Sequence, residues 1–218
     1  MKVGVDAVIL GSWADTSGVK SILDIGTGTG LLSLMLAQKC DASITAIDID
    51  EDSFIQARFN FENSKWNSRI SVQHNSFQNF TKHSNQKFDL IICNPPYFVK
   101  SLKSADIKRN IARHDDALPL ESLFEGVSSQ LSEAGKFYII YPFVQKDYLF
   151  MVSVKNKLYP SRELIIKGTS AKVPNRIIVE FSHTEGKCAE QELIVRNHPG
   201  GEYTEEYKTL TAEYYLAF

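Results

Sequence analysis

A predicted strand that runs directly into a glycine loop is the feature that most constrains the fold of this chain. The segment Ser21–Ile25 is mostly apolar and predicts a buried strand. Glycine then occupies every second position from Gly26 to Gly30, and the apolar run Leu31–Ala37 predicts a helix. Glycines allow the backbone to approach a ligand closely. A strand, a glycine loop and a helix in succession indicate a parallel α/β sheet that binds its ligand at the carboxyl ends of the strands.

The spacing of the glycines separates several kinds of nucleotide-binding loop. A dinucleotide fingerprint requires a third glycine where Leu31 stands, and a P-loop requires a Gly-Lys-Ser/Thr sequence that is absent. The pattern Asp24-x-Gly26-x-Gly28-x-Gly30 instead resembles motif I of the class I methyltransferases, which implies a loop that holds S-adenosyl-L-methionine (SAM). In that reading Asp24 receives the positively charged amino-acid end of SAM, directly or through water. A glycine turn with a purely structural role is the alternative.

The next two predicted strands supply further candidate cofactor contacts. Asp48 follows the strand Ser43–Ile47, about twenty residues after the glycine loop, which is the usual position of a carboxylate that binds ribose hydroxyls. We expect Asp50 to cap a helix over residues 52–63 that buries Ile55. After the third strand, over residues 70–74, Ser76 and Phe77 stand where many methyltransferases carry an acid for the adenine of SAM. Ser76, or the amide of Asn75, could replace that acid, with Phe77 beside the ring.

The stretch Phe88–Tyr97 carries the candidate chemistry. A buried strand over residues 88–93 ends at Asn94, and Pro95 and Pro96 then prevent the strand from continuing, because proline has no N–H to donate. An exocyclic amine on a planar group could give its two N–H bonds to the Asn94 side-chain oxygen and the Pro95 carbonyl while Tyr97 stacks on the plane. The stretch resembles the Asn-Pro-Pro-Tyr motif of class I methyltransferases that modify adenine N6 or the glutamine side-chain amide. The alternative is a strand followed by a proline turn, with Tyr97 as core.

A basic segment follows this motif. Its cationic side chains belong to Lys100, Lys103, Lys108, Arg109 and Arg113. Beside a base-binding motif they suggest contacts with RNA phosphates, which would weaken with salt. The alternative is a solvated surface loop.

The remaining pattern predicts the fold. A helix over residues 118–131 is expected to end at Ala134-Gly135, and a strand over residues 136–142 follows. Three later strands, without helices between them, indicate antiparallel additions at one edge. We predict a Rossmann-like α/β fold with a mostly parallel seven-stranded sheet, helices on both faces and antiparallel edge strands near the C-terminus. We expect one domain over residues 1–218, with an N-terminal cofactor lid (1–18), a SAM-binding and catalytic core (19–142), and C-terminal edge strands with a terminal helix (143–218).

Composition limits the remaining possibilities. The formal net charge is −2, which is not the strongly basic balance of a general nucleic-acid-binding protein, so contacts with RNA must come from a local patch. Cys40, Cys93 and Cys188 are widely spaced and odd in number, which fits neither a disulfide framework nor a zinc cluster. No apolar run approaches the ~20 residues that span a membrane. We expect a cytoplasmic monomer that binds no metal and no membrane.

Several stretches together resemble one family. They are Met1-Lys2-Val3-Gly4-x-Asp6, the glycine loop, Asn94-Pro95-Pro96-Tyr97, Ala112-Arg113-His114 and the closing segment over residues 203–216. They resemble the bacterial tRNA methyltransferases that make N6-methyladenosine at adenine 37 of a valine tRNA, and the likeness covers nearly the whole chain. Members usually carry an aromatic-rich segment ahead of the Met-Lys-Val-Gly stretch, and the printed sequence starts without it. The resemblance implies that Lys2, Val3 and Gly4 lie against the cofactor as a lid that Asp6 steadies.

Taken together, the sequence predicts transfer of a methyl group from SAM to adenine N6 in the single-stranded anticodon loop of a tRNA, with S-adenosyl-L-homocysteine as the product. The expected catalytic residues are Asn94, Pro95, Pro96 and Tyr97. The expected cofactor residues are Lys2, Val3, Gly4, Asp6, Asp24, Gly26, Gly28, Gly30, Asp48, Ile49, Ser76, Phe77 and Asn94. Two alternatives stay open: a methyltransferase that acts on a glutamine amide in a protein, and a SAM-binding, RNA-binding protein without turnover.

Overall fold

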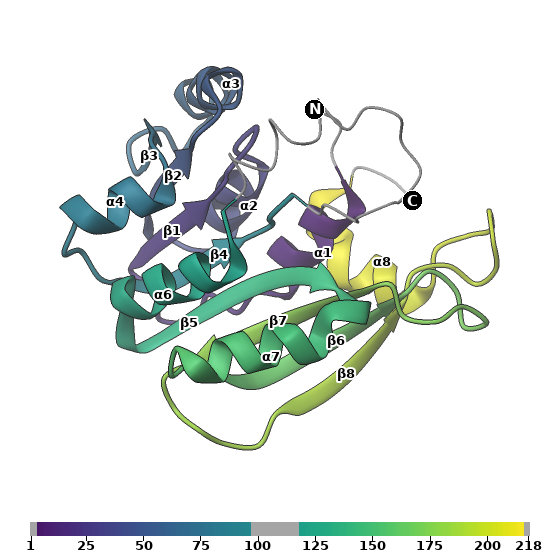
Figure 1. The fold of residues 1–218 in the computed structure, drawn as a ribbon. Helices are drawn as coiled ribbons and strands as arrows, with labels where there is room; N and C mark the ends of the chain where they lie inside the picture. Colours follow the sequence, from purple (N-terminus) through teal and green to yellow (C-terminus); the bar gives the residue numbers. More distant parts are fainter. Residues whose placement is uncertain (1–3, 97–117, 216–218) are drawn as a thin grey trace, which may run out of the picture.

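The computed structural model describes residues 4–96 and 118–215 (Figure 1). The strands in it are β1 (Ser21–Ile25), β2 (Ser43–Asp48), β3 (Ile70–His74), β4 (Phe88–Cys93), β5 (Leu131–Pro142), β6 (Tyr159–Lys167), β7 (Arg176–Ser182) and β8 (Ala189–Ile194). The helices are α1 (Val5–Trp13), α2 (Leu31–Lys39), α3 (Glu51–Glu62), α4 (Phe77–His83), α6 (Leu120–Gln130), α7 (Lys146–Lys155) and α8 (Glu205–Thr211), with short 3-10 turns at Phe143–Gln145 and Ala212–Tyr214.

All the described strands join one sheet in the order β3-β2-β1-β4-β5-β7-β6-β8. The α/β class and the helices on both faces are confirmed, but the sheet has eight strands rather than the seven that we predicted. The predicted antiparallel pairing near the C-terminus is confirmed for β7, but the predicted place of that pairing at the edge of the sheet is not. Only β7 runs against the others, and it lies inside the sheet between β5 and β6, while the edge strand β8 pairs parallel to β6. A local pattern identifies strands, but it does not identify their partners.

Alternating side chains of the central strand divide the core into two layers. Leu90 and Ile92 of β4 point to the face that α1, α2, α3 and α8 cover. Ile91 and Cys93 point to the opposite face, under α4, α6 and α7, and Phe88 packs there too because the pairing with β5 shifts register between Phe88 and Leu90. Side chains of a strand alternate between faces, so a strand that is apolar throughout must be covered on both. The result is a three-layer arrangement with the sheet in the middle (Figure 1).

Two local predictions fail because contacts distant in the sequence decide the outcome. Helix α6 ends at Gln130, and Ala134-Gly135 lie within β5 rather than in a turn, since the strand already pairs with β4 from Leu131 onward. Ile55, which we expected in the core, is 48% exposed on the outer side of α3. Helix α3 lies near the β2–β3 end of the sheet and buries only a narrow stripe of side chains, those of Ala57 and Phe61.

Other features bear on the classes of function. No helix in the described part of the chain combines the length and the apolar character needed to cross a bilayer. Residues 4–96 and 118–215 also contain no group of three or more His, Cys, Asp or Glu side chains that could hold a metal ion. The three cysteines are free thiols.

Candidate active site

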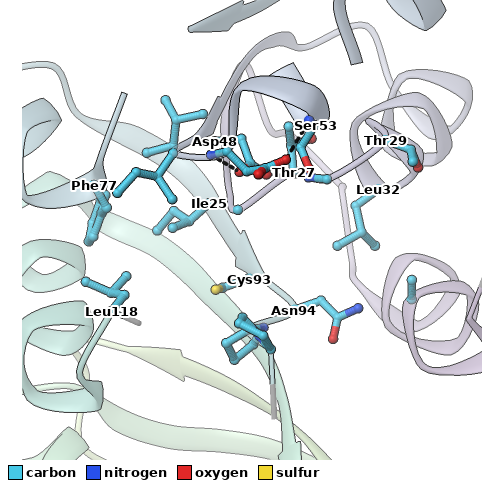
Figure 2. A pocket seen from close by; sticks show the side chains of 18 of the residues that line it. Ile25, Thr27, Thr29, Leu32, Asp48, Ser53, Phe77, Cys93, Asn94 and Leu118 are labelled. Carbon is cyan, nitrogen blue, oxygen red and sulfur yellow. Dashed lines mark hydrogen bonds between the residues drawn. The ribbon is translucent and has the colours of Figure 1, made fainter. Parts of the chain in front are cut away.

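A cavity of about 560 Å³ opens at the carboxyl ends of β1, β2 and β4 (Figure 2). Its volume lies in the range of small-molecule and cofactor sites. Its walls come from the start of α1, the glycine loop, the end of β2, the segment that leads into α4, the end of β4, and Leu118. Open α/β sheets bind ligands at this edge, where the loops after neighbouring strands converge. The cavity is therefore the candidate active site.

Backbone hydrogen bonds fix the glycine loop against β2. The N–H groups of Gly26 and Thr27 both donate to the carbonyl of Ile47, at 2.9 and 3.0 Å. The N–H of Gly28 donates to Oδ2 of Asp48 at 2.7 Å. These bonds join the ends of two parallel strands into one rigid wall. The loop is therefore held in place before any ligand binds.

Two glycines of the loop serve different purposes, although both have positive φ. At Gly30, with φ of 82°, an added Cβ would lie 2.3 Å from the ring of Phe61, so close packing of the loop on α3 excludes any side chain. At Gly26, with φ of 68°, an added Cβ would meet no atom within 4 Å. Because Gly26 lines the cavity, the space beside it belongs to the cavity. Its lack of a side chain leaves that space for a ligand.

Asp24 lies beneath the loop and does not line the cavity, which differs from the direct contact that the sequence left open. Its side chain is fully buried, and Oδ2 accepts hydrogen bonds from the hydroxyls of Thr27 at 2.6 Å and Ser33 at 2.7 Å. Oδ1 has no hydrogen-bond partner. Burial raises the pKa of the Asp24 carboxyl to about 6, and the negative charge of Asp48 adds to the effect, while the two hydroxyls oppose it. A buried carboxyl with an unsatisfied oxygen is suited to a cationic ligand group reached through water.

Asp48 and Ile49 lie together at the end of β2, where both line the cavity. Asp48 is 8% exposed, and its Oδ1 accepts a hydrogen bond from the N–H of Asp50 at 2.9 Å. Each carboxylate oxygen has two lone pairs, so both can still accept from a ligand hydroxyl. Ile49 is 53% exposed, which places an apolar surface at the cavity mouth. The prediction for Asp50 is confirmed, since its side chain caps α3 by accepting from Ser53 N–H at 2.8 Å.

The apolar end of the cavity is formed by Phe77 and Leu118, which lie near each other in Figure 2. Asn75 and Ser76 also line the cavity. The Ser76 hydroxyl caps α4 by accepting from the N–H of Asn79 at 3.1 Å, and it keeps its own hydrogen to donate. The sequence missed Leu118 because it follows the cavity motifs by more than twenty residues and no local signal connects them.

Asn94 lies directly after β4, at the centre of the carboxyl edge of the sheet. Together with Cys93, Pro95 and Pro96 it lines the cavity. In Figure 2 the Asn94 amide points to the side on which Leu32 lies, opposite Phe77 and Leu118. Burial, followed by the charges of nearby carboxylates, raises the pKa of the Cys93 thiol, which favours the neutral thiol over the nucleophilic thiolate.

The start of α1 closes the cavity beside these residues, with Gly4, Asp6 and Ala7 in its wall. Asp6 Oδ2 accepts a hydrogen bond from Arg176 Nε at 2.8 Å. Arg176 is the first residue of β7, and no local pattern connects two residues so far apart in the chain. The other predicted site residues lie outside the described residues: Lys2, Val3, Tyr97, Lys100, Lys103, Lys108, Arg109 and Arg113.

Comparison with known sequences shows similarity to methyltransferases. Residues 17–209 match the family described as "Methyltransferase domain". A tRNA1(Val) (adenine(37)-N6)-methyltransferase of Bacteroides fragilis is 42% identical over 219 residues, which cover 99% of this chain and 91% of the relative. Proteins with the same name in Bacteroides thetaiotaomicron and Flavobacterium psychrophilum are 43% and 39% identical, each over 99% of this chain and over 91% and 93% of the relative.

Solved structures show the same fold. The structure of a protein described as a predicted O-methyltransferase from Agrobacterium tumefaciens has a TM-score of 0.74 at 17% identity, over 95% of this chain and 96% of that chain. A glycopeptide N-methyltransferase in complex with SAM has a TM-score of 0.57 at 10% identity, over 76% of this chain and 87% of that chain. At these identities the likeness concerns the fold alone.

Proposed function

The chain belongs to the family of the tRNA1(Val) (adenine(37)-N6)-methyltransferases, and from this membership we propose that it transfers a methyl group from SAM to N6 of adenine 37 in a valine tRNA. One observation of the structure supports this most strongly. Asn94 and Pro95 line the same cavity as the glycine loop and Asp48, so a base-binding motif and a nucleoside-binding wall face one space.

The residues of the cavity fit SAM. Asp48, at the end of β2, is placed to accept the ribose hydroxyls, and Ile49 and Phe77 offer apolar surfaces for the adenine ring. The open space beside Gly26 lets the backbone approach the methionine part of SAM, and the unpartnered oxygen of Asp24 below it suits the ammonium group. The Ser76 hydroxyl can donate a hydrogen bond to a ring nitrogen of the adenine, whereas the acid found in many methyltransferases accepts one from the adenine amine.

Asn94 and Pro95 would activate the target amine by positioning it. The lone pair of the adenine amine is delocalised into the ring, so the amine is a poor nucleophile. Accepting its two hydrogens at the Asn94 side-chain oxygen and the Pro95 carbonyl would hold the amine with its lone pair toward the cofactor. SAM, when bound, supplies an electrophilic methyl group and leaves S-adenosyl-L-homocysteine as the product, and the methylated amine would release one of its two protons to water. Positioning of this kind contributes up to roughly 7–11 kcal/mol in ideal cases.

The tRNA would be recognised partly outside the described residues. Tyr97 is proposed to stack on the adenine, which is typically worth about 1–3 kcal/mol per base. The basic side chains from Lys100 to Arg113 are proposed to contact phosphates near the anticodon loop. Because adenine 37 lies in a single-stranded loop, moving it out of its stack costs less than extruding a paired base.

The test is transfer of labelled methyl from SAM to a valine tRNA transcript, followed by nucleoside analysis. We expect N6-methyladenosine, and none when guanine replaces adenine 37. We expect Asn94→Ala to reduce the transfer rate at least about 100-fold and to leave SAM affinity nearly unchanged. Asn67→Ala is the matched control, because Asn67 is an exposed asparagine in the turn before β3, at the edge of the sheet opposite the cavity.

Three outcomes would overturn the proposal. Label in protein but not in RNA would indicate the glutamine-amide reading. Binding of SAM without transfer to any acceptor would indicate an RNA-binding protein without turnover. Equal activity of Asn94→Ala and the unmodified protein would refute the role of Asn94.

We also propose that the protein acts as a monomer in the bacterial cytoplasm, with residues 1–18 as a cofactor lid, residues 19–142 as the catalytic core and residues 143–218 as the C-terminal part of the same domain. Light scattering on the purified protein would test the monomer: a mass near 24.6 kDa is expected, and twice that value would contradict it.

A further inference from the structure

The first turn of α1 is held against the cavity by Arg176, which lies 170 residues later in the chain than Asp6. Arg176 is the first residue of β7, where it pairs with Pro142 of β5 and Ile166 of β6. Its Nε donates to Asp6 Oδ2 at 2.8 Å, across 170 residues of sequence. The two side chains are 27% and 32% exposed, so the pair is partly shielded from water. Asp6 itself lines the cavity.

The two ends of α1 are anchored differently. At the C-terminal end, Lys39 donates to the carbonyls of Gly11, Ser12 and Ala14, and Lys136 pairs with Asp15 at 2.9 Å. At the N-terminal end, Gly4 occupies the cap position, and no side chain of the described residues caps the helix there. An acid in the first turn of a helix is favourable by itself, but it does not fix where that turn lies. The ion pair with Arg176 does fix it.

The location of Arg176 connects two parts of the site. Strand β7 neighbours β5, which in turn neighbours β4, the strand that carries Asn94. Neighbouring strands lie about 4.8 Å apart, so Arg176 stands two strand spacings, or about 10 Å, from the line of β4. From there it reaches over the carboxyl edge of the sheet to Asp6 in the cofactor wall.

We propose that Arg176 is a positioning residue for the cofactor: through Asp6 it holds the first turn of α1 in place as one wall of the SAM cavity. The proposal rests on the proposed function in that it takes SAM as the ligand of the cavity. Arg176 is not itself a wall of the cavity, so it acts through Asp6 and not by touching the reacting atoms. Its loss should weaken cofactor binding and leave the methyl-transfer step nearly unchanged.

The experiment measures SAM affinity by calorimetry together with KM for SAM and kcat. For Arg176→Gln we expect the Kd and the KM for SAM to rise about fivefold, as for the loss of a well-formed ion pair, with kcat within about twofold of the unmodified protein. Arg176→Lys keeps the charge and is expected to recover part of the affinity, and it also serves if Arg176→Gln does not fold. Thermal unfolding without SAM verifies folding of each variant.

Lys136→Gln is the matched control. It breaks an ion pair of similar length, 2.9 Å, between side chains of similar exposure, 35% and 36%, at the far end of the same helix. It should lower thermal stability about as much as Arg176→Gln and leave SAM affinity unchanged. A fall in SAM affinity that is as large in Lys136→Gln as in Arg176→Gln would overturn the proposal, because any loosening of α1 would then have the same effect.

A double-mutant cycle tests whether the two residues act through each other. If they do, Arg176→Gln combined with Asp6→Asn should bind SAM no more weakly than Asp6→Asn alone. Two results would overturn the inference. One is a loss of SAM affinity in the double variant that equals the sum of the losses in the two single variants. The other is a Kd for SAM of Arg176→Gln that lies within twofold of the Kd of the unmodified protein. If the unmodified protein itself fails to bind SAM, the proposed function fails, which is a result distinct from either of these.

Discussion

Replacing Asp24 by asparagine should remove the pH dependence of stability that its buried carboxyl imposes, while weakening the function of the protein. Asp24 is fully buried, and an asparagine of nearly the same shape can still accept from the hydroxyls of Thr27 and Ser33 through its amide oxygen. The amide nitrogen would replace Oδ1, which has no hydrogen-bond partner. The substitution therefore removes a buried charge with little change in packing. The ammonium group of SAM would lose its counter-charge, so SAM affinity should fall.

The magnitude follows from the pKa of Asp24. Burial raises it from 3.8 to about 6, so between about pH 4 and pH 6 the folded protein binds more protons at this site than the unfolded chain does. The contribution of Asp24 to the free energy of unfolding is therefore greatest below about pH 4, falls as the pH rises to about 6, and is constant above that. The contribution of Asp24 well below pH 4 therefore exceeds its contribution above pH 6 by about 3 kcal/mol, since a pKa difference of one unit corresponds to about 1.4 kcal/mol.

The assay is urea unfolding at several pH values between about 4 and 8, followed by tryptophan fluorescence, for which the buried Trp13 is a suitable probe. The quantity of interest is the unfolding free energy of Asp24→Asn minus that of the unmodified protein, because the other titrating groups then cancel. This difference should increase by about 2.4 kcal/mol from pH 4 to pH 7, because the unfolded chain is already partly deprotonated at pH 4.

Asp41→Asn is the control for loss of one negative charge, because the Asp41 side chain is fully exposed. A difference for Asp24→Asn that stays constant from pH 4 to pH 7 would refute the reasoning, because it would mean that Asp24 titrates alike in the folded and unfolded states.

Gly30→Ala should lower the free energy of unfolding by about 3 kcal/mol or more, because the added Cβ would overlap the Phe61 ring and the φ of residue 30 is positive. A loss below about 1 kcal/mol in urea unfolding would contradict this expectation. Gly26→Ala should lower the free energy of unfolding by only about 1–2 kcal/mol, since the added Cβ meets no atom. It should nevertheless weaken SAM binding, which calorimetry measures. Unchanged SAM affinity would show that the ligand does not use the space beside Gly26. Lys39→Met keeps the apolar stem of the side chain and removes the ammonium that satisfies the last carbonyls of α1, so thermal unfolding should show a loss of about 1–3 kcal/mol. A neutral effect of Lys39→Met would mean that water replaces the ammonium without cost.

The sequence by itself determined the local parts of the site. The glycine loop lies between a buried strand and a helix, Asp48 ends the next strand, Asp50 caps α3, and Asn94 follows β4 at the edge where the cavity opens. Each of these depends on hydrogen bonds or steric limits within a few residues, which the spacing of glycines, prolines and acids expresses directly. The roles of Asn94, Tyr97 and the basic segment in catalysis and RNA binding stay predictions.

Only the tertiary structure decided which distant residues meet. It placed β7 inside the sheet and paired β8 parallel to β6, moved Asp24 beneath the loop instead of into the cavity wall, and brought Arg176 to Asp6. It also put Phe61 against Gly30, which explains why that glycine tolerates no side chain. The physical reason is common to all of them. Strand partners and cross-chain contacts are selected by burial of the whole core, and no local pattern of residues records that selection.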